Sequence, residues 1–242
     1  MAGARITAAV AVLALLVSAP GAAAVPPAPP APIVPPPVQP ANIGDLKAEV
    51  TRYYDSGAYL TDLQLAAWPA IPWITDQAAA VVRPAVVFDI DETALSNWEV
   101  IKANDFGRVI SGACTALPKG PCGWQAWDQS AESTLIPPTK DVFDTARDRG
   151  AAIFFITGRP ESQRAATERN LTDVGYAGYT RLIMEPTGAQ YVSAVDFKAP
   201  QRQALEGEGY TIIANMGDQP SDLDGGFAER TFLLPNPFYR IP

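Results

Sequence analysis

The sequence contains no histidine among its 242 residues. This absence excludes a Ser-His-Asp triad, a phosphatase with a histidine nucleophile and the usual histidine-containing zinc sites. Cysteine is scarce too, with only Cys114 and Cys122 present. A cysteine phosphatase needs an arginine six positions after its nucleophile, and those positions hold Gly120 and Asp128. Carboxylates therefore remain as the candidate nucleophiles and metal ligands.

Basic residues are also few. The chain has 18 Lys and Arg against 26 Asp and Glu, which gives a formal net charge of −8 and a pI near 4.6. A surface that binds nucleic-acid polymers needs clustered Lys and Arg, so we expect no such surface. The length is sufficient for one sizeable core and does not require two. The composition therefore predicts one folded domain.

The first apolar run of the chain is short. Residues 6–17 follow Arg5 and precede Ser18-Ala19-Pro20-Gly21 and three alanines, the pattern of a secretory signal peptide with an Ala-x-Ala cleavage site. An uncleaved anchor is the alternative, but the run is too short for a comfortable membrane span. We predict that residues 1–24 are removed and that the mature protein is secreted or cell-envelope associated, without a stable membrane span.

The next segment is rich in proline. Residues 25–41 contain nine of the 24 prolines and no charged residue, a composition that favours extended polyproline II and cannot build a core. We predict a linker here and a globular domain over residues 42–242. Apolar residues at helical spacing over 46–54 and 60–67 predict helices that end where Pro69 and Pro72 interrupt the pattern.

An apolar run at residues 86–88 ends in Asp89 and Asp91. Short apolar runs are typical of buried parallel strands, and ligands bind outside the carboxyl ends of such strands. Side chains two positions apart on a strand point the same way, so the two carboxylates should share one site. Two close like charges need stabilisation, for which a bound cation is the usual means. In the alternative interpretation, Asp91 or Thr93 only caps the following helix.

Residues 96–135 lack clean periodicity and contain both cysteines and three of the five tryptophans. We interpret this stretch as an insertion after the first strand. In an exported protein, Cys114 and Cys122 are expected to form a disulfide. The insertion could be a small cap over the site or a stapled surface loop whose tryptophans cover the core.

After Pro138 the pattern alternates between helices and strands. The predicted helices cover residues 139–149, 160–170 and 200–206, and the predicted strands cover 151–156, 182–184, 210–216 and 231–234.

Polar residues are found at three further places, two at the ends of predicted strands and one near the start of a predicted helix. Thr157-Gly158-Arg159 precedes Pro160, so this turn should present free N–H groups at a helix start, where phosphate binds well, although a cap without a ligand is the alternative. Lys198 should lie just before its helix, although a solvated surface lysine is the default. The strand over 210–216 ends in Gly217-Asp218-Gln219-Pro220-Ser221-Asp222.

Together these residues resemble the four motifs of the haloacid dehalogenase (HAD) superfamily, which are Asp89-x-Asp91-x-Thr93, Thr157-Gly158-Arg159, Lys198 and Gly217-Asp218-x-x-x-Asp222. The closing Leu-Pro-Asn-Pro-Phe-Tyr resembles the secreted acid phosphatases of subfamily IIIB, the group that includes plant vegetative storage proteins. The resemblance covers roughly residue 43 to the end. It implies a three-layer, Rossmann-like α/β fold with a central parallel sheet and a small cap insertion after the first motif strand.

The resemblance also implies the roles of the acids. Asp89 would be the nucleophile that forms an aspartyl-phosphate, and Asp91 would protonate the leaving group and later activate water. Mg²⁺ would be held by Asp89, the backbone carbonyl of Asp91 and Asp218, with Asp222 orienting its waters.

Further implied roles concern the substrate. Thr157, Gly158 and Lys198 would hold the phosphoryl oxygens. Independently of the resemblance, we expect Trp124 and Trp127 to form an apolar rim over the leaving group, which would favour aryl or nucleoside monophosphates over small sugar phosphates.

We therefore expect an exported, Mg²⁺-dependent acid phosphatase that hydrolyses small-molecule phosphate monoesters. A catalytically silent storage or binding protein would keep the same fold, although the presence of Asp89 argues against it. A phosphotransferase that moves phosphate to an acceptor alcohol would share every motif. The sequence makes no prediction of oligomeric state.

Overall fold

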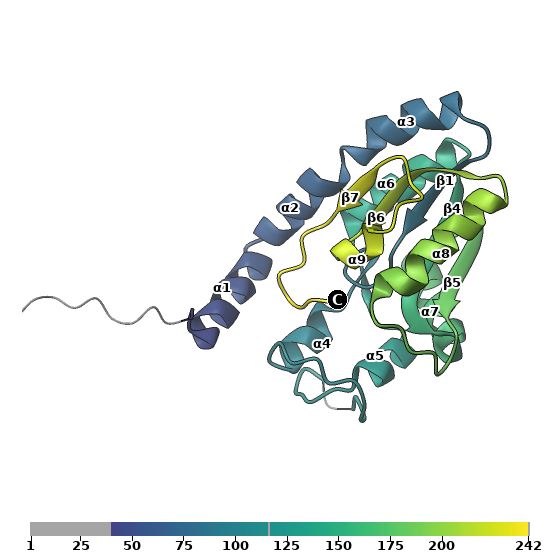
Figure 1. The fold of residues 1–242 in the computed structure, drawn as a ribbon. Helices are drawn as coiled ribbons and strands as arrows, with labels where there is room; N and C mark the ends of the chain where they lie inside the picture. Colours follow the sequence, from purple (N-terminus) through teal and green to yellow (C-terminus); the bar gives the residue numbers. More distant parts are fainter. Residues whose placement is uncertain (1–39, 116, 242) are drawn as a thin grey trace, which may run out of the picture. The chain divides into compact units, whose positions relative to one another are not determined.

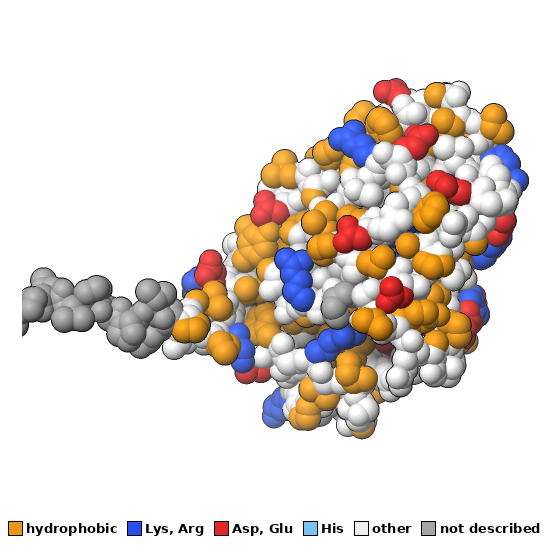
Figure 2. Space-filling model, in the orientation of Figure 1, with side chains coloured by type: hydrophobic (Ala, Val, Ile, Leu, Met, Phe, Trp, Pro, Cys, Tyr) orange, Lys and Arg blue, Asp and Glu red, His pale blue; other side chains and the backbone are white. Residues whose placement is uncertain are grey.

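The computed structural model of the chain describes residues 40–115 and 117–241 (Figure 1). The predicted signal peptide and nearly all of the predicted linker lie outside these residues. Within the described ranges, no helix combines the length and the apolar character needed to cross a membrane. On the face shown in Figure 2, Lys and Arg side chains are dispersed among acidic and apolar ones.

A five-stranded parallel sheet forms the centre of the domain, with the strand order β5-β4-β1-β6-β7. Its strands are β1 (Pro84–Phe88), β4 (Ala152–Pro160), β5 (Arg181–Glu185), β6 (Thr211–Gly217) and β7 (Thr231–Leu233). The predicted α/β fold with a central parallel sheet is confirmed. The central strand, β1, is the one that delivers Asp89.

Both faces of the sheet are covered, which explains why its strands are apolar throughout. Along β1, Val86 and Phe88 belong to one buried cluster, and Ala85 and Val87 belong to another. Helices α2 (Ala58–Ala67), α3 (Ala70–Ala80), α6 (Pro137–Asp148) and α7 (Arg164–Asp173) contribute to the first cluster, and α8 (Ala194–Gly207) to the second. The result is three layers.

The amino-terminal helices differ from the prediction. Three helices form, α1 (Ile43–Asp55), α2 and α3, where two were expected. Pro72 does not end a helix but lies in the first turn of α3. A proline is tolerated there because the first N–H groups of a helix have no partner within it.

The two ends of the insertion lie side by side, because β2 (Leu95–Ser96) pairs antiparallel with β3 (Thr134–Leu135). Between them lie α4 (Trp98–Ala103) and α5 (Trp124–Ser130), near the lower ends of the sheet strands in Figure 1. The Cys114–Cys122 disulfide is formed.

Two boundaries near the expected site were predicted wrongly. Thr157-Gly158-Arg159 is not a turn into a helix, because β4 continues to Pro160 with an irregularity between Thr157 and Pro160. A short 3₁₀ helix, η1 (Glu161–Gln163), then leads into α7. Helix α8 begins before Lys198, since Ser193 and Asp196 form a capping box at its start, and Pro200 lies inside it.

Candidate active site

Asp89 is the first residue after β1, and its carboxylate is buried against Lys198 from α8. The Lys198 ammonium donates to Oδ1 of Asp89 at 2.5 Å and to Oδ1 of Asp222 at 2.6 Å. Burial raises the pKa of Asp89 well above its ordinary value, although the Lys198 charge opposes this rise. Burial disfavours the charged form of Lys198, but Asp222 and Asp89 more than compensate and raise its pKa. The resemblance implied that Lys198 holds phosphoryl oxygens, and the structure places its ammonium group beside two of the strand-end acids.

Asp218 joins the same group. Oxygens of Asp89, Asp218 and Asp222, all buried, lie within 4.8 Å of one another. Burial and the nearby charges of Asp222 and Glu92 raise the pKa of Asp218 to about 7. Three carboxylates this close carry more negative charge than one ammonium offsets. An all-oxygen set of this kind suits a hard divalent cation.

Neighbouring groups fix the orientation of the acids. Asp218 accepts hydrogen bonds from Thr93 Oγ1 at 3.1 Å, Gln219 Nε2 at 2.6 Å and Asn236 Nδ2 at 2.7 Å. The Gln219 backbone N–H donates to Oδ2 of Asp222 at 2.8 Å. These bonds leave the two carboxylates little rotational freedom, as a preorganised ion site requires.

Asp91 has different partners. Its carboxylate accepts hydrogen bonds from Arg159, from Nη2 at 2.6 Å and from Nε at 3.1 Å. It also accepts a hydrogen bond from Asn97 Nδ2 at 2.8 Å. Burial acts to raise the pKa of Asp91, but the Arg159 guanidinium outweighs it and holds the pKa below the usual range. No role was predicted for Arg159 from the sequence. Its position directly after Thr-Gly at a strand end was the signal that could have identified it.

Arg159 also contacts a second carboxylate, supplied by the insertion. Oδ1 of Asp128, on α5, lies 3.3 Å from the Arg159 Nη2 atom. Burial raises the pKa of Asp128 to about 7, against the opposing charge of Arg159. Sequence reasoning missed Asp128, because an acid inside an aperiodic insertion carries no local signal of its partner.

The Thr-Gly segment lies beside the same acids. Thr157 is fully buried, and its Oγ1 accepts a hydrogen bond from the Arg159 N–H at 3.1 Å. The Thr157 hydroxyl can still donate its own proton. Gly158 is exposed, and the irregularity in the ladder between β4 and β5 falls at this residue.

The carboxyl-terminal segment closes another side of the site. Asn236 reaches Asp218, and the Tyr239 hydroxyl donates to Oε2 of Glu92. Burial and the charge of Asp91 raise the pKa of Glu92 to about 8. The Pro-Asn-Pro-Phe-Tyr stretch contributes to the family resemblance, but its sequence predicts no contact with the acids.

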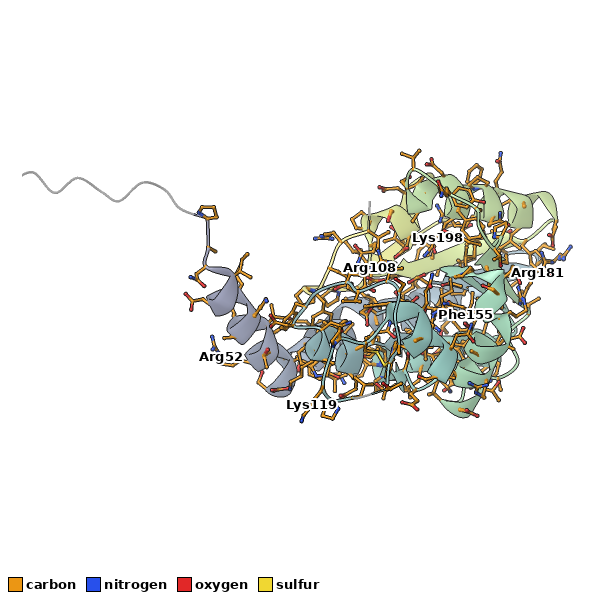
Figure 3. All side chains as sticks on the ribbon, turned by 90° about the horizontal axis from the view of Figure 1, so that it is seen from below. Arg52, Arg108, Lys119, Phe155, Arg181 and Lys198 are labelled. Atoms are coloured by element: carbon orange, nitrogen blue, oxygen red, sulfur yellow. A yellow bond between two sulfur atoms is a disulfide. The ribbon has the colours of Figure 1, made fainter. Side chains whose placement is uncertain are left out.

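These groups surround a cavity of about 530 Å³. The predicted residues that line it are Asp89, Asp91, Trp124, Gly158, Lys198, Asp218 and Asp222. Figure 3 shows two basic residues of the same lining, Arg108 and Lys198.

The predicted tryptophan rim is only half present. Trp124 lines the cavity, but Trp127 is buried and its Nε1 donates to Oδ1 of Asn97 at 2.8 Å. Trp127 is therefore a structural residue that positions Asn97, which in turn contacts Asp91.

Known proteins resemble this chain in sequence. Residues 38–242 match the family described as HAD superfamily, subfamily IIIB (acid phosphatase). The "Stem 28 kDa glycoprotein" of Glycine max is 34% identical over 162 residues, which are 66% of this chain and 61% of that protein. "Acid phosphatase 1" of Solanum lycopersicum is 29% identical over 160 residues, 66% and 60% of the two chains. "Vegetative storage protein 1" of Arabidopsis thaliana is 31% identical over 157 residues, which are 64% of this chain and 55% of that protein. The match thus spans less than two thirds of each relative.

A solved structure shares the fold. The class C acid phosphatase from Bacillus anthracis with tungstate bound superimposes with a TM-score of 0.62 at 23% identity, over 81% of this chain and 86% of that one. This likeness supports the fold alone. The family match, by contrast, covers all of the described residues, including every strand end that carries an acid. The chain therefore belongs to subfamily IIIB, the acid phosphatases, of the HAD superfamily.

Proposed function

We propose that this protein is an exported, Mg²⁺-dependent acid phosphatase that hydrolyses phosphate monoesters through an aspartyl-phosphate on Asp89. The observation that carries the proposal is the position of Asp89, at the end of the central strand, against Lys198 and two further buried carboxylates. Covalent catalysis needs a nucleophile held beside groups that offset the charge of its substrate.

The residues present fit a magnesium ion. Asp89, Asp218 and the backbone carbonyl of Asp91 would hold it. Burial and, after it, the charges of Asp222 and Glu92 raise the pKa of Asp218, and a bound cation would offset both effects. When bound, Mg²⁺ would offset the negative charge of the phosphate and the nucleophile. Asp222 is occupied by Lys198 and the Gln219 N–H, so it would orient water around the ion.

In the first step, a carboxylate oxygen of Asp89 attacks phosphorus and the bond from phosphorus to the ester oxygen breaks. Lys198, the Thr157 hydroxyl and the Gly158 N–H would hold the phosphoryl oxygens. Asp91 gives its proton to the departing alcohol. In the second step, Asp91 takes a proton from water, which attacks phosphorus and releases phosphate and free Asp89.

Arg159 limits the pH range in which Asp91 can act as a general acid. Because Arg159 holds the pKa of Asp91 below the usual value, Asp91 carries its proton only at a lower pH than an ordinary carboxyl group would. Alkyl esters, whose leaving alcohols need protonation, should therefore be hydrolysed faster as the pH falls toward that lowered pKa.

The test is hydrolysis of an aryl phosphate by residues 25–242, with and without Mg²⁺. We expect a chelator to abolish the activity and Mg²⁺ to restore it, and we expect Asp89→Asn to be inactive. Full activity in a rigorously metal-free sample would contradict the metal assignment. No turnover at any pH would favour a storage protein, as the name of one relative suggests. Phosphorylated product after addition of an alcohol would indicate a phosphotransferase.

Export is part of the same proposal. It is supported by the signal-peptide pattern of residues 1–24 and by the two cysteines, which form a disulfide. Amino-terminal sequencing of protein recovered outside the cell should begin at Val25. A start at Met1 would contradict cleavage.

A further inference from the structure

Three exposed apolar side chains lie at the mouth of the active-site cavity. Ile110 is 45% exposed, Tyr191 39% and Val192 92%, and all three line the cavity that contains Asp89 and Lys198. We call these three side chains the mouth patch. Val192 is the most exposed large apolar side chain of residues 40–115 and 117–241. Exposed apolar side chains that gather beside a cavity commonly mark a place where a ligand binds.

Val192 is exposed although its position in the sequence would allow it to be buried. It directly precedes Ser193, the residue that caps α8, and an apolar residue there often packs against the fourth residue of the helix, here Phe197. Tyr191 makes that contact instead, with its ring centroid 5.3 Å from the ring centroid of Phe197. The packing of α8 therefore does not require an apolar residue at position 192.

The insertion supplies the rest of the mouth patch. The backbone carbonyl of Ile110 accepts a hydrogen bond from the Gln125 N–H at 3.1 Å, so the start of α5 fixes its position. Trp124 is only 7% exposed, and the Arg108 guanidinium lies over its ring, 5.8 Å from the centroid. Trp124 therefore offers little free ring surface on which an aryl group could stack, whereas the Ile110 side chain is open to a ligand.

The mouth patch is small, which limits what can occupy it. A stable protein–protein interface covers about 800 Å² on each partner, far more than three side chains offer. A leaving group too long for the cavity, by contrast, must pass over the patch when its phosphate lies against Asp89. Resting on the phosphatase function above, we propose that the mouth patch binds an alkyl chain of the leaving group. The preferred substrates are then single-chain amphiphilic phosphate monoesters.

The experiment compares kcat/KM for ethyl phosphate and n-octyl phosphate, each kept below its critical micelle concentration. Burial of one methylene strengthens binding by about fourfold, and partial burial on an open surface by about twofold. If about four of the added methylenes lie on the mouth patch, the wild-type protein should prefer n-octyl phosphate by about 10-fold. The gain should appear in KM more than in kcat, because the chain lies away from the reacting atoms. The double variant Ile110→Ser, Val192→Ser should bring the ratio toward one.

The matched control is Val82→Ser. Val82 is 80% exposed, but it precedes β1 at the end opposite Asp89 and is not part of the cavity lining, so its replacement should leave the ratio unaltered. A wild-type ratio near one would overturn the proposal, and so would an unchanged ratio in the double variant.

Two further outcomes would identify a different occupant. A higher kcat/KM for 2-phenylethyl phosphate, which has as many carbons as n-octyl phosphate, would indicate aromatic stacking and overturn the assignment to an alkyl chain. A preference for n-octyl phosphate seen only above its critical micelle concentration would indicate an assembled lipid surface and overturn the assignment to a single chain. If none of these esters nor an aryl phosphate is hydrolysed, the phosphatase function itself has failed, which is a distinguishable result.

Discussion

Replacement of Lys198 by Met tests whether the cluster of Asp89, Asp218 and Asp222 binds a metal ion or is neutralised by Lys198 alone. Lys198 is 4% exposed and bonds to both Asp89 and Asp222. Met has a similar length but no charge, so the substitution leaves two buried carboxylates without their partner. Loss of one partner from a buried ion pair typically costs about 3 to 5 kcal/mol. We expect the free energy of unfolding of the metal-free variant to fall by that amount at pH 7.5.

Saturating Mg²⁺ should recover much of this loss. In the wild-type protein, Lys198 already offsets part of the charge of Asp89 and Asp222, whereas in the variant only the ion does so. The variant should therefore bind Mg²⁺ more tightly and gain more stability from it, because stabilisation by a ligand grows with affinity. Phosphatase activity should stay low even when stability is recovered, since the charge that faces the phosphoryl oxygens is gone.

The assay is urea unfolding of both proteins with a chelator and with excess Mg²⁺. The matched control is Lys140→Met, which removes a partly exposed lysine paired with Asp144 at 2.6 Å. Exposed pairs of this kind contribute about 1 kcal/mol or less. The reasoning is refuted if Lys198→Met costs no more than Lys140→Met. It is also refuted if Mg²⁺ adds the same increment to the wild-type protein and to Lys198→Met.

Three further predictions concern other parts of the site. Asp91→Asn should turn over an aryl phosphate roughly 10²- to 10⁴-fold more slowly and accumulate phosphate on Asp89, detected by mass spectrometry after an acid quench; a phosphate on another residue would identify a different nucleophile. Reduction of the Cys114–Cys122 disulfide should lower the melting temperature, because closing this loop in the unfolded chain stabilises the folded state by about 2 to 3 kcal/mol. An unchanged melting temperature would contradict this. Asp128 has its pKa raised from 3.8 to about 7, so the folded state binds a proton that the unfolded state has lost between these values, and stability should fall as the pH rises through this window. Asp128→Asn should flatten that fall in thermal unfolding curves, whereas identical pH profiles for the two proteins would show that Asp128 does not carry the proton.

The sequence predicted the strand-end acids well because their signal is local. An apolar run that breaks at Asp89 is typical of a buried strand, and the strands over 182–184 and 210–216 were located within about a residue in the same way. The errors arose where local rules compete. Pro200 predicted a helix start, but the Ser193 capping box begins α8 earlier, and the helix accommodates the proline.

The chain order of the motifs was sufficient to indicate the family. The absence of histidine, and of an arginine six positions after either cysteine, was sufficient to indicate a carboxylate chemistry. Which groups hold those carboxylates was decided only by the tertiary structure. Arg159 lies 68 positions from Asp91, and Asn236 lies 18 positions from Asp218, yet both pairs are in hydrogen-bond contact. A strand end can be recognised from neighbouring residues because side-chain alternation and burial act over a few positions. The partner of a buried charge depends on how distant segments pack around it, and no local pattern records that choice.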